Sequence, residues 1–168
     1  MTQLLKFFGL TIILVYLFVS TFGQRTGITN LPGHLTVADI DKICNSIDNN
    51  KNLGEGIREG EALDKKGGFD TYYLQDNLNK TLYRVTDNIS TDKHCTTIFY
   101  YNRNKVIKAI TTITDKDLTK KKYSATYYFA NNKLIKKIGE SGNYSNYKDI
   151  LKQGVDFQEQ FYKDMRRL

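Results

Sequence analysis

The chain has few of the residues on which common functional motifs depend. Its 168 residues include one proline, two cysteines and two histidines. One proline and 12 glycines exclude collagen-like and proline-rich disordered classes. The length suffices for one ordinary domain and is too short for two of typical size. We therefore expect a single folded domain.

The scarcity of histidine and cysteine argues against metal and nucleophilic chemistry. His34 and His94 form no recognised ligand spacing with Cys44 and Cys95. His94 precedes Cys95 directly, but adjacent strand residues point to opposite faces, so an activated thiol is not expected there. We predict no catalytic residue, no metal site and no cofactor.

Three carboxylates keep one enzymatic alternative open. Glu55, Glu59 and Glu61 could supply paired acids for glycoside chemistry, if a cleft brought one of them close to another acid. The charged face of an exposed strand explains the same spacing. A small exported hydrolase that uses these carboxylates is therefore the alternative to a binding function.

The N-terminus carries the pattern of a secretory signal. Lys6 precedes an apolar run over residues 7–19, and Thr21 and Gly23 place small side chains before a cleavage site at Gln24. We predict a signal peptide over residues 1–23 and a secreted or periplasmic product. The alternative is an uncleaved anchor, because residues 7–23 reach the short limit of a membrane-spanning helix.

The positive charge is concentrated in the middle of the chain. Lysine and arginine total 25 against 18 acids, and residues 93–137 hold eleven basic residues against two acidic ones. Ten of those eleven are lysines, which act as hydrated point charges, whereas planar recognition calls for arginine. The segment favours an anionic protein, polysaccharide or envelope surface as partner over sequence-specific nucleic acid. Lysines that only keep strand edges soluble would give the same pattern.

Two helices are predicted, one at each end of the domain. Residues 24–35 lack periodicity and read as a linker, so the domain should cover residues 36–168. Thr36 and Asp39 have the spacing of a capping box before an amphipathic helix over residues 37–49. Apolar residues from Ile150 to Leu168 recur at helical spacing, and Gly154 is a point where that helix could bend.

An internal repeat dominates the region between the helices. Residues 99–110 align without gaps on residues 127–138, and a weaker copy begins at Tyr72. Each copy predicts a β-hairpin with a two-residue turn, at Arg103-Asn104 or Asn131-Asn132, because asparagine tolerates positive φ. The whole pattern predicts an α+β fold: an antiparallel meander of about seven strands with both helices packed on one face.

Strand alternation then predicts an exposed binding face opposite the helices. We expect an aromatic row with flanking lysines, formed by Tyr73, Tyr100, Tyr128, Lys105, Lys133 and Lys137. Cys44 and Cys95 should both face the helix–sheet interface and form a disulfide, since export permits one. The leading interpretation is an exported non-enzymatic binding module, of an inhibitor, immunity or envelope-associated kind. A purely structural envelope component is a further alternative.

Overall fold

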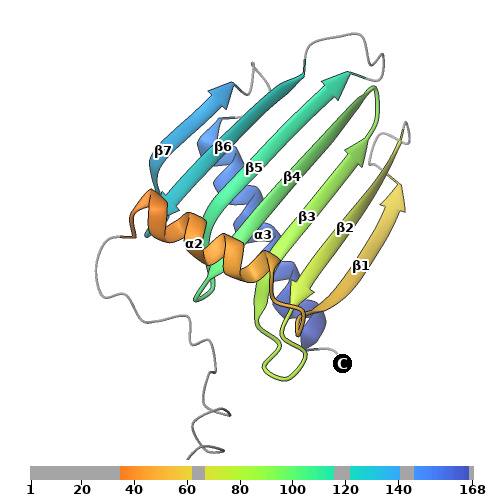
Figure 1. The fold of residues 1–168 in the computed structure, drawn as a ribbon. Helices are drawn as coiled ribbons and strands as arrows, with labels where there is room; N and C mark the ends of the chain where they lie inside the picture. Colours follow the sequence, from red (N-terminus) through yellow and green to blue (C-terminus); the bar gives the residue numbers. More distant parts are fainter. Residues whose placement is uncertain (1–34, 62–66, 116–121, 141–145, 167–168) are drawn as a thin grey trace, which may run out of the picture. The chain divides into compact units, whose positions relative to one another are not determined.

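An antiparallel sheet of seven strands forms the centre of the fold (Figure 1). The computed structural model describes residues 35–61, 67–115, 122–140 and 146–166. The expected signal segment and all of the linker but Leu35 lie outside these ranges. The strands are β1 (Gly54–Glu61), β2 (Gly68–Gln75), β3 (Leu82–Ser90), β4 (Lys93–Asn102), β5 (Lys105–Asp115), β6 (Tyr123–Ala130) and β7 (Lys133–Glu140). Their spatial order follows the chain, so the predicted α+β meander is confirmed.

Helix α2 (Val37–Asp48) begins where the capping box predicts. The backbone N–H of Asp39 donates to Thr36 Oγ1 at 3.2 Å, and the backbone N–H of Thr36 donates to Asp39 Oδ2 at 3.0 Å. Both bonds satisfy N–H groups that the first helical turn leaves without an internal acceptor.

Helix α3 (Tyr147–Met165) runs unbroken through Gly154. A β-carbon at position 154 would lie 2.8 Å from Cδ1 of Phe99 and 2.9 Å from Cγ2 of Val106. Its carbonyl oxygen also accepts a hydrogen bond from the Tyr101 hydroxyl at 2.8 Å. Glycine is therefore required for the close approach of α3 to the sheet, and it does not bend the helix.

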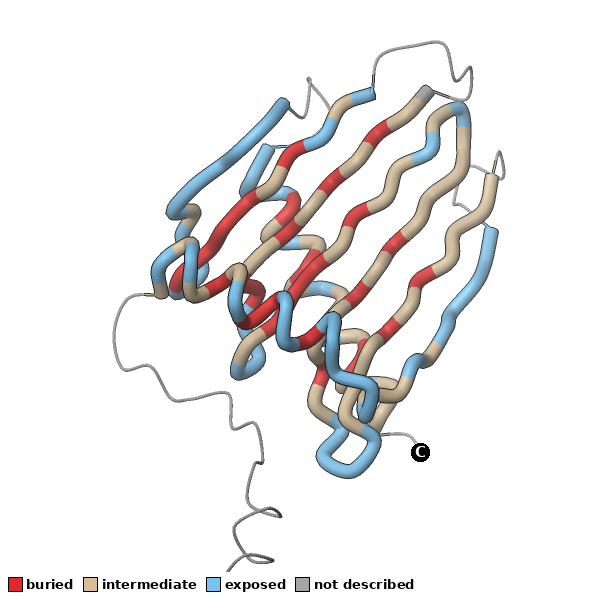
Figure 2. The backbone as a smooth tube through the Cα atoms, viewed as in Figure 1, coloured by how far each residue is buried: buried red, intermediate tan, exposed pale blue. Residues whose placement is uncertain are grey.

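The two helices cover opposite faces of the sheet, which corrects the expectation that they share one face. Figure 1 shows α2 in front of the strands and α3 behind them. Ile40, Cys44 and Ile47 of α2 pack with Tyr100 and Tyr128. A separate cluster joins α3 to the other face through Ile150, Phe161, Phe99, Tyr101 and Tyr127. Adjacent strand residues such as Phe99 and Tyr100 are both buried because each face has its own helix (Figure 2).

The three hairpins share a β-bulge at the same place. The register shifts between Tyr100 and Tyr101 opposite Ile107, and between Tyr128 and Phe129 opposite Ile135. In the weak copy the shift falls between Leu74 and Gln75. The extra residue lies in the second strand of each hairpin. Every side chain after it in that strand lies on the face opposite to the one that uninterrupted alternation predicts. Ile110 and Ile138 consequently lie on the α2 face, whereas uninterrupted alternation places them opposite α2.

The predicted turn residues adopt the predicted backbone. Arg103 and Asn104 have φ values of 50° and 57°, and Asn131 and Asn132 have values of 50° and 60°. These paired positive angles are those of the primed turns whose twist matches the flanking strands.

Candidate functional site

The expected exposed row of tyrosines does not form. Tyr73 lies on the α3 face and stacks on Phe161 with ring centroids 5.8 Å apart. Tyr100 and Tyr128 lie on the α2 face and are only 6% and 5% exposed. The shared bulge makes Leu74, and not Tyr73, the counterpart of Tyr100 and Tyr128. The prediction was therefore wrong both in register and in exposure.

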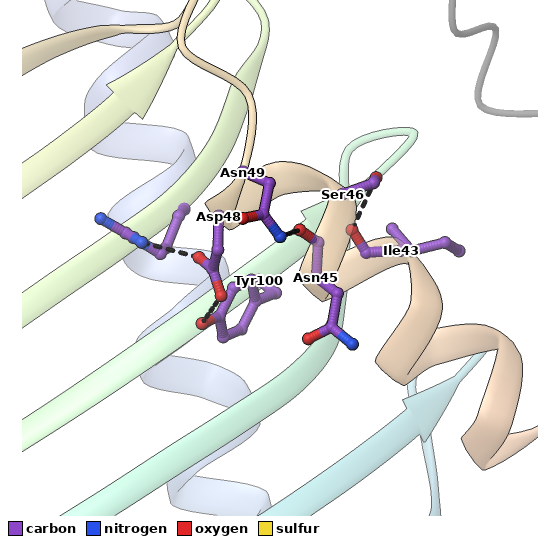
Figure 3. Close-up of polar contacts among 7 residues, drawn as sticks. Ile43, Asn45, Ser46, Asp48, Asn49 and Tyr100 are labelled. Carbon is purple, nitrogen blue, oxygen red and sulfur yellow. Dashed lines mark hydrogen bonds and ion pairs between the residues drawn. The ribbon is translucent and has the colours of Figure 1, made fainter.

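The buried hydroxyl of Tyr100 helps to hold the C-terminal end of α2 on the sheet. Figure 3 shows the Asp48 carboxylate beside Tyr100, whose hydroxyl donates to Asp48 Oδ2 at 2.9 Å. Arg84 of β3 lies 2.7 Å from the other carboxylate oxygen. Burial, followed by the hydrogen bond to Asp48, raises the pKa of Tyr100 well above its ordinary value. The phenol is therefore a protonated hydrogen-bond donor at neutral pH.

A second anchor, again an aspartate bound by a tyrosine and a basic residue, lies two helical turns earlier. Lys108 Nζ lies 2.6 Å from Asp41 Oδ1 and 5.1 Å from the centre of the Tyr128 ring. The Tyr128 hydroxyl donates to the same carboxylate at 3.2 Å. Burial is the largest single influence on the pKa of Lys108 and lowers it, but the hydrogen bond to Asp41 and the neighbouring Cys44, Tyr128 and Asp41 groups together raise that pKa. Asp41 and Asp48 are seven residues apart, so both project from one side of α2 toward the sheet.

The predicted disulfide is wrong, because both cysteines are free thiols on different faces of the sheet. Cys44 packs under α2 with Tyr100 and Ile107. Cys95 shares strand parity with Thr97, and its sulfur lies 4.0 Å from the Thr97 hydroxyl. Burial raises the pKa of Cys44 to about 12 and raises that of Cys95 as well. Neither thiol is an activated nucleophile, since nucleophilic attack requires the thiolate.

A buried carboxylate under α3 escaped the sequence analysis. Asp87 of β3 is 4% exposed, accepts a hydrogen bond from Thr71 Oγ1 at 2.8 Å and lies 3.3 Å from Gln153 Nε2 of α3. Burial raises its pKa, and the bond from Thr71 opposes that shift. Thr97 and Thr111 continue this polar row across the sheet, with their hydroxyls 3.4 Å apart. Asp87 lies two residues after Val85, so strand alternation places it on the same face as that apolar residue. This spacing was the signal in the sequence that could have identified Asp87 as buried.

The three candidate carboxylates lie together on edge strand β1. Glu55, Glu59 and Glu61 are exposed and share the α2 face, and Glu59 is the register partner of Asp70. Asp70 in turn accepts a hydrogen bond from Asn88 at 2.8 Å. Like charges at opposed positions repel. Asp70 adds a further negative charge beside the glutamates of the β1 edge. The hydrolase alternative stays a hypothesis.

The candidate lysines gather near the opposite edge of the sheet. Lys105, Lys133 and Lys137 are exposed, and Lys105 Nζ donates to Asn131 Oδ1 at 3.4 Å between two neighbouring turns. Lys137 Nζ lies 5.4 Å from the centre of the Tyr127 ring. Lys136 was absent from the predicted row, because strict alternation assigns it to the face opposite Ile135. The bulge at Ile135 places both side chains on the same face. Two of the three candidate lysines, Lys133 and Lys137, therefore lie on β7, and they do not flank an exposed row of Tyr73, Tyr100 and Tyr128.

Two isoleucines make β7 more than a charged edge. Ile135 is 43% exposed and Ile138 is 47% exposed, and Lys136 lies between them. On the opposite edge Ile57 is 54% exposed. Among the described residues, each of these strands has one hydrogen-bonded neighbour in the sheet. An edge strand presents unpaired N–H and C=O groups, which makes it a template for a further strand.

A surface groove of about 610 Å³ lies along α3. Tyr162 donates to Asn104 of the β4–β5 turn at 2.7 Å within it. All its other lining residues come from α3 and its C-cap, so Asn104 is the one group that a second element adds to the lining, and Tyr162 already binds it. Across the described ranges, no three histidine, cysteine or acidic residues are placed to hold a metal ion. No helix within those ranges has the length and apolar character needed to cross a membrane.

Comparisons of the chain with protein-family models, with curated proteins and with solved structures returned no match.

Proposed function

We propose that the protein is an exported, non-enzymatic binding module that takes an acidic, extended protein segment along the β7 edge. The observation that carries this proposal is the composition of β7, an edge strand with lysines and two half-exposed isoleucines on its surface. Strand addition draws affinity from main-chain hydrogen bonds and specificity from alternate side chains.

The charge and the apolar surface of β7 define the partner's chemistry. Lys133 and Lys136 attract carboxylates from a distance, and this attraction accelerates encounter and weakens with salt. Ile135 and Ile138 flank Lys136 and offer apolar contact to alternate side chains of a bound strand. A polysaccharide has no N–H and C=O ladder to pair with β7, so a protein segment fits this edge better.

The central groups support binding over catalysis because they are already engaged. Tyr100 and Tyr128 hold α2, and Asp87 is held by Thr71 and Gln153. Cys44, whose pKa is about 12, has no nucleophilic thiolate at neutral pH.

Export rests on the N-terminal apolar run. Cleavage before Gln24 removes residues 1–23 and leaves a mature chain with 24 basic and 18 acidic residues. Intact-mass analysis of protein from cells that express the full chain tests this. A mass that begins at Gln24 supports export, whereas full-length protein in the membrane fraction favours the anchored alternative.

A binding assay with a defined probe tests the β7 edge. The probe is a fluorescent peptide of alternating glutamate and valine, titrated with exported protein purified from cells that express the full chain. Lys133→Glu combined with Lys136→Glu should weaken binding by about tenfold or more, and added salt should weaken wild-type binding. Lys163→Glu on α3 is the matched control, because Lys163 is also exposed.

Three outcomes overturn the proposal. One is equal loss of affinity in the control variant. Another is no binding to the peptide at low salt. The third is tighter binding to vesicles rich in phosphatidylglycerol than to the peptide, which would identify a lipid surface as the partner.

A further inference from the structure

We infer that the acidic segment paired with β7 is the β1 edge of a second copy of this chain, so that copies add head to tail and extend the sheet. This inference rests on the proposed function, because it names the partner of the same edge. The two edges carry opposite charge: lysines on β7, and Glu55, Glu59 and Glu61 on β1.

The topology favours pairing between unlike edges. Seven antiparallel strands make β1 and β7 run in the same direction, as their arrows show in Figure 1. Pairing of two β7 edges centred on Lys136 would oppose lysine to lysine, and pairing of two β1 edges centred on Ile57 would oppose Glu55 to Glu59. Like charges at opposed positions are destabilising, and the unlike pair avoids the penalty that these like pairs carry.

Ile57 of β1 and Ile138 of β7 are the two ends of one row of side chains across the sheet. On the α2 face, the strand registers connect Ile57, Tyr72, Thr86, Ile98, Ile110, Thr126 and Ile138. When a second copy continues the sheet in register, its Ile57 follows Ile138 of the first copy. The contact removes from water part of the surface of two side chains that are 54% and 47% exposed.

The neighbouring row ends in opposite charges. It consists of Glu55, Leu74, Arg84, Tyr100, Lys108, Tyr128 and Lys136. The register that joins Ile138 to the second copy's Ile57 also brings Lys136 beside its Glu55. One placement therefore satisfies the apolar contact and the charge pair together.

The α3 face is compatible with the same placement because each large side chain meets a glycine. The row that begins at Gly56 ends at Lys137, and the row that begins at Arg58 ends at Gly139. Continuation places Lys137 beside Gly56 of the next copy and Gly139 beside its Arg58. Neither pair crowds two long side chains.

One pair opposes the association and gives a sharp test. The row that begins at Glu59 ends at Glu140, so the same register brings two carboxylates together. This head-to-tail contact leaves a β7 and a β1 edge free on the growing assembly, so it does not close into a dimer. A single strand edge is a small interface, so association should be weak and dependent on concentration.

Sedimentation velocity over a hundredfold range of protein concentration measures the association. The wild type should form species that grow with concentration and shrink with salt. Lys136→Glu and Glu55→Lys should each reduce association by about tenfold, and the two together in one chain should restore it. Glu59→Lys should strengthen association, because it turns the repulsive pair into an attractive one. Lys163→Glu should leave association unchanged.

The variants separate this inference from the proposed function. Glu55→Lys should still bind the glutamate–valine peptide, because its β7 edge is intact. A wild type that binds the peptide and stays monomeric at every concentration overturns the inference and leaves the proposed function standing. Failure of the charge reversal to restore association overturns the register. Loss of both peptide binding and association overturns both proposals.

Discussion

The central strands and the edge strands of this sheet differ in what their side chains contact. In β4, Phe99 and Tyr101 pack against α3 while Tyr100 packs under α2. In β7 every residue except Leu134 is exposed, and Figure 2 shows the strand in the colour of exposed residues along most of its length. Residues that resemble functional groups in sequence lie in the centre and hold the helices. The exposed charge and apolar surface lie at the edges, where a partner can reach them.

Removal of a central aromatic side chain should have the largest effect on stability. Phe99 is fully buried, and its ring centroid lies 5.8 Å from that of Phe157 on α3. Phe99→Ala should lower the free energy of unfolding by about 4 kcal/mol. Urea denaturation followed by circular dichroism measures this. Ile57→Ala on the exposed edge is the control, and an equal loss in both variants would erase the distinction between centre and edge.

Loss of one anchoring hydroxyl should have an intermediate effect. Tyr100→Phe removes the donor to Asp48 and leaves the ring in place, so the free energy of unfolding should fall by about 1 kcal/mol. Tyr147→Phe, at an exposed position, should change it by less than about 0.5 kcal/mol. Equal stability of the Tyr100→Phe variant and the wild type in the same urea titration would show that this bond does not hold α2.

The buried acid of the centre should make stability depend on pH. Burial raises the pKa of Asp87 above its ordinary 3.8, so the folded state binds the proton of the Asp87 carboxyl group more strongly than the unfolded state does. This group therefore adds stability as pH falls toward the ordinary value, and that contribution is lost as pH rises through the raised pKa. Relative to the wild type, the free energy of unfolding of Asp87→Asn should be most favourable at neutral pH. This difference in favour of the variant should shrink as the pH falls toward about 4.

Unfolding midpoints measured across this pH range test the sign. Glu61→Gln is the control, because Glu61 is exposed on β1. An advantage of Asp87→Asn that grows as the pH falls would contradict the raised pKa.

Charge reversal on the edge should have the smallest effect on stability. Lys136 is exposed on a strand with one neighbour, so Lys136→Glu should change the free energy of unfolding by less than about 0.5 kcal/mol. Thermal unfolding checks this. A loss above about 1 kcal/mol would mean that β7 contributes to folding more than its exposure indicates.

Local patterns were enough to predict the elements of this fold. Thr36 and Asp39 mark the start of α2, and the paired residues Arg103-Asn104 and Asn131-Asn132 mark two turns. The aromatic and aliphatic runs between them predict the strands. These signals act over a few residues, so the sequence contains them directly.

The placement of the helices and the site could not be read in the same way. Strict alternation divides each strand into one buried and one exposed face, but the bulges at Ile107 of β5 and Ile135 of β7 interrupt it. A second helix on the far face buries the side chains that alternation assigns to solvent. The disulfide prediction failed for this reason, since Cys44 and Cys95 lie on different faces. Asp41, Cys44 and Asp48 share one side of α2, and this polar stripe was the available signal of a helix docked on tyrosines.

The central claim is that partners meet this protein at the β7 edge and not on its faces. Backbone amide spectra recorded during titration with the glutamate–valine peptide test that claim most directly. The account predicts that amides of residues 133–140 shift and become protected from hydrogen exchange, while those of β4 stay unchanged. Shifts centred on β4 or on the helices, with β7 unaffected, would contradict it.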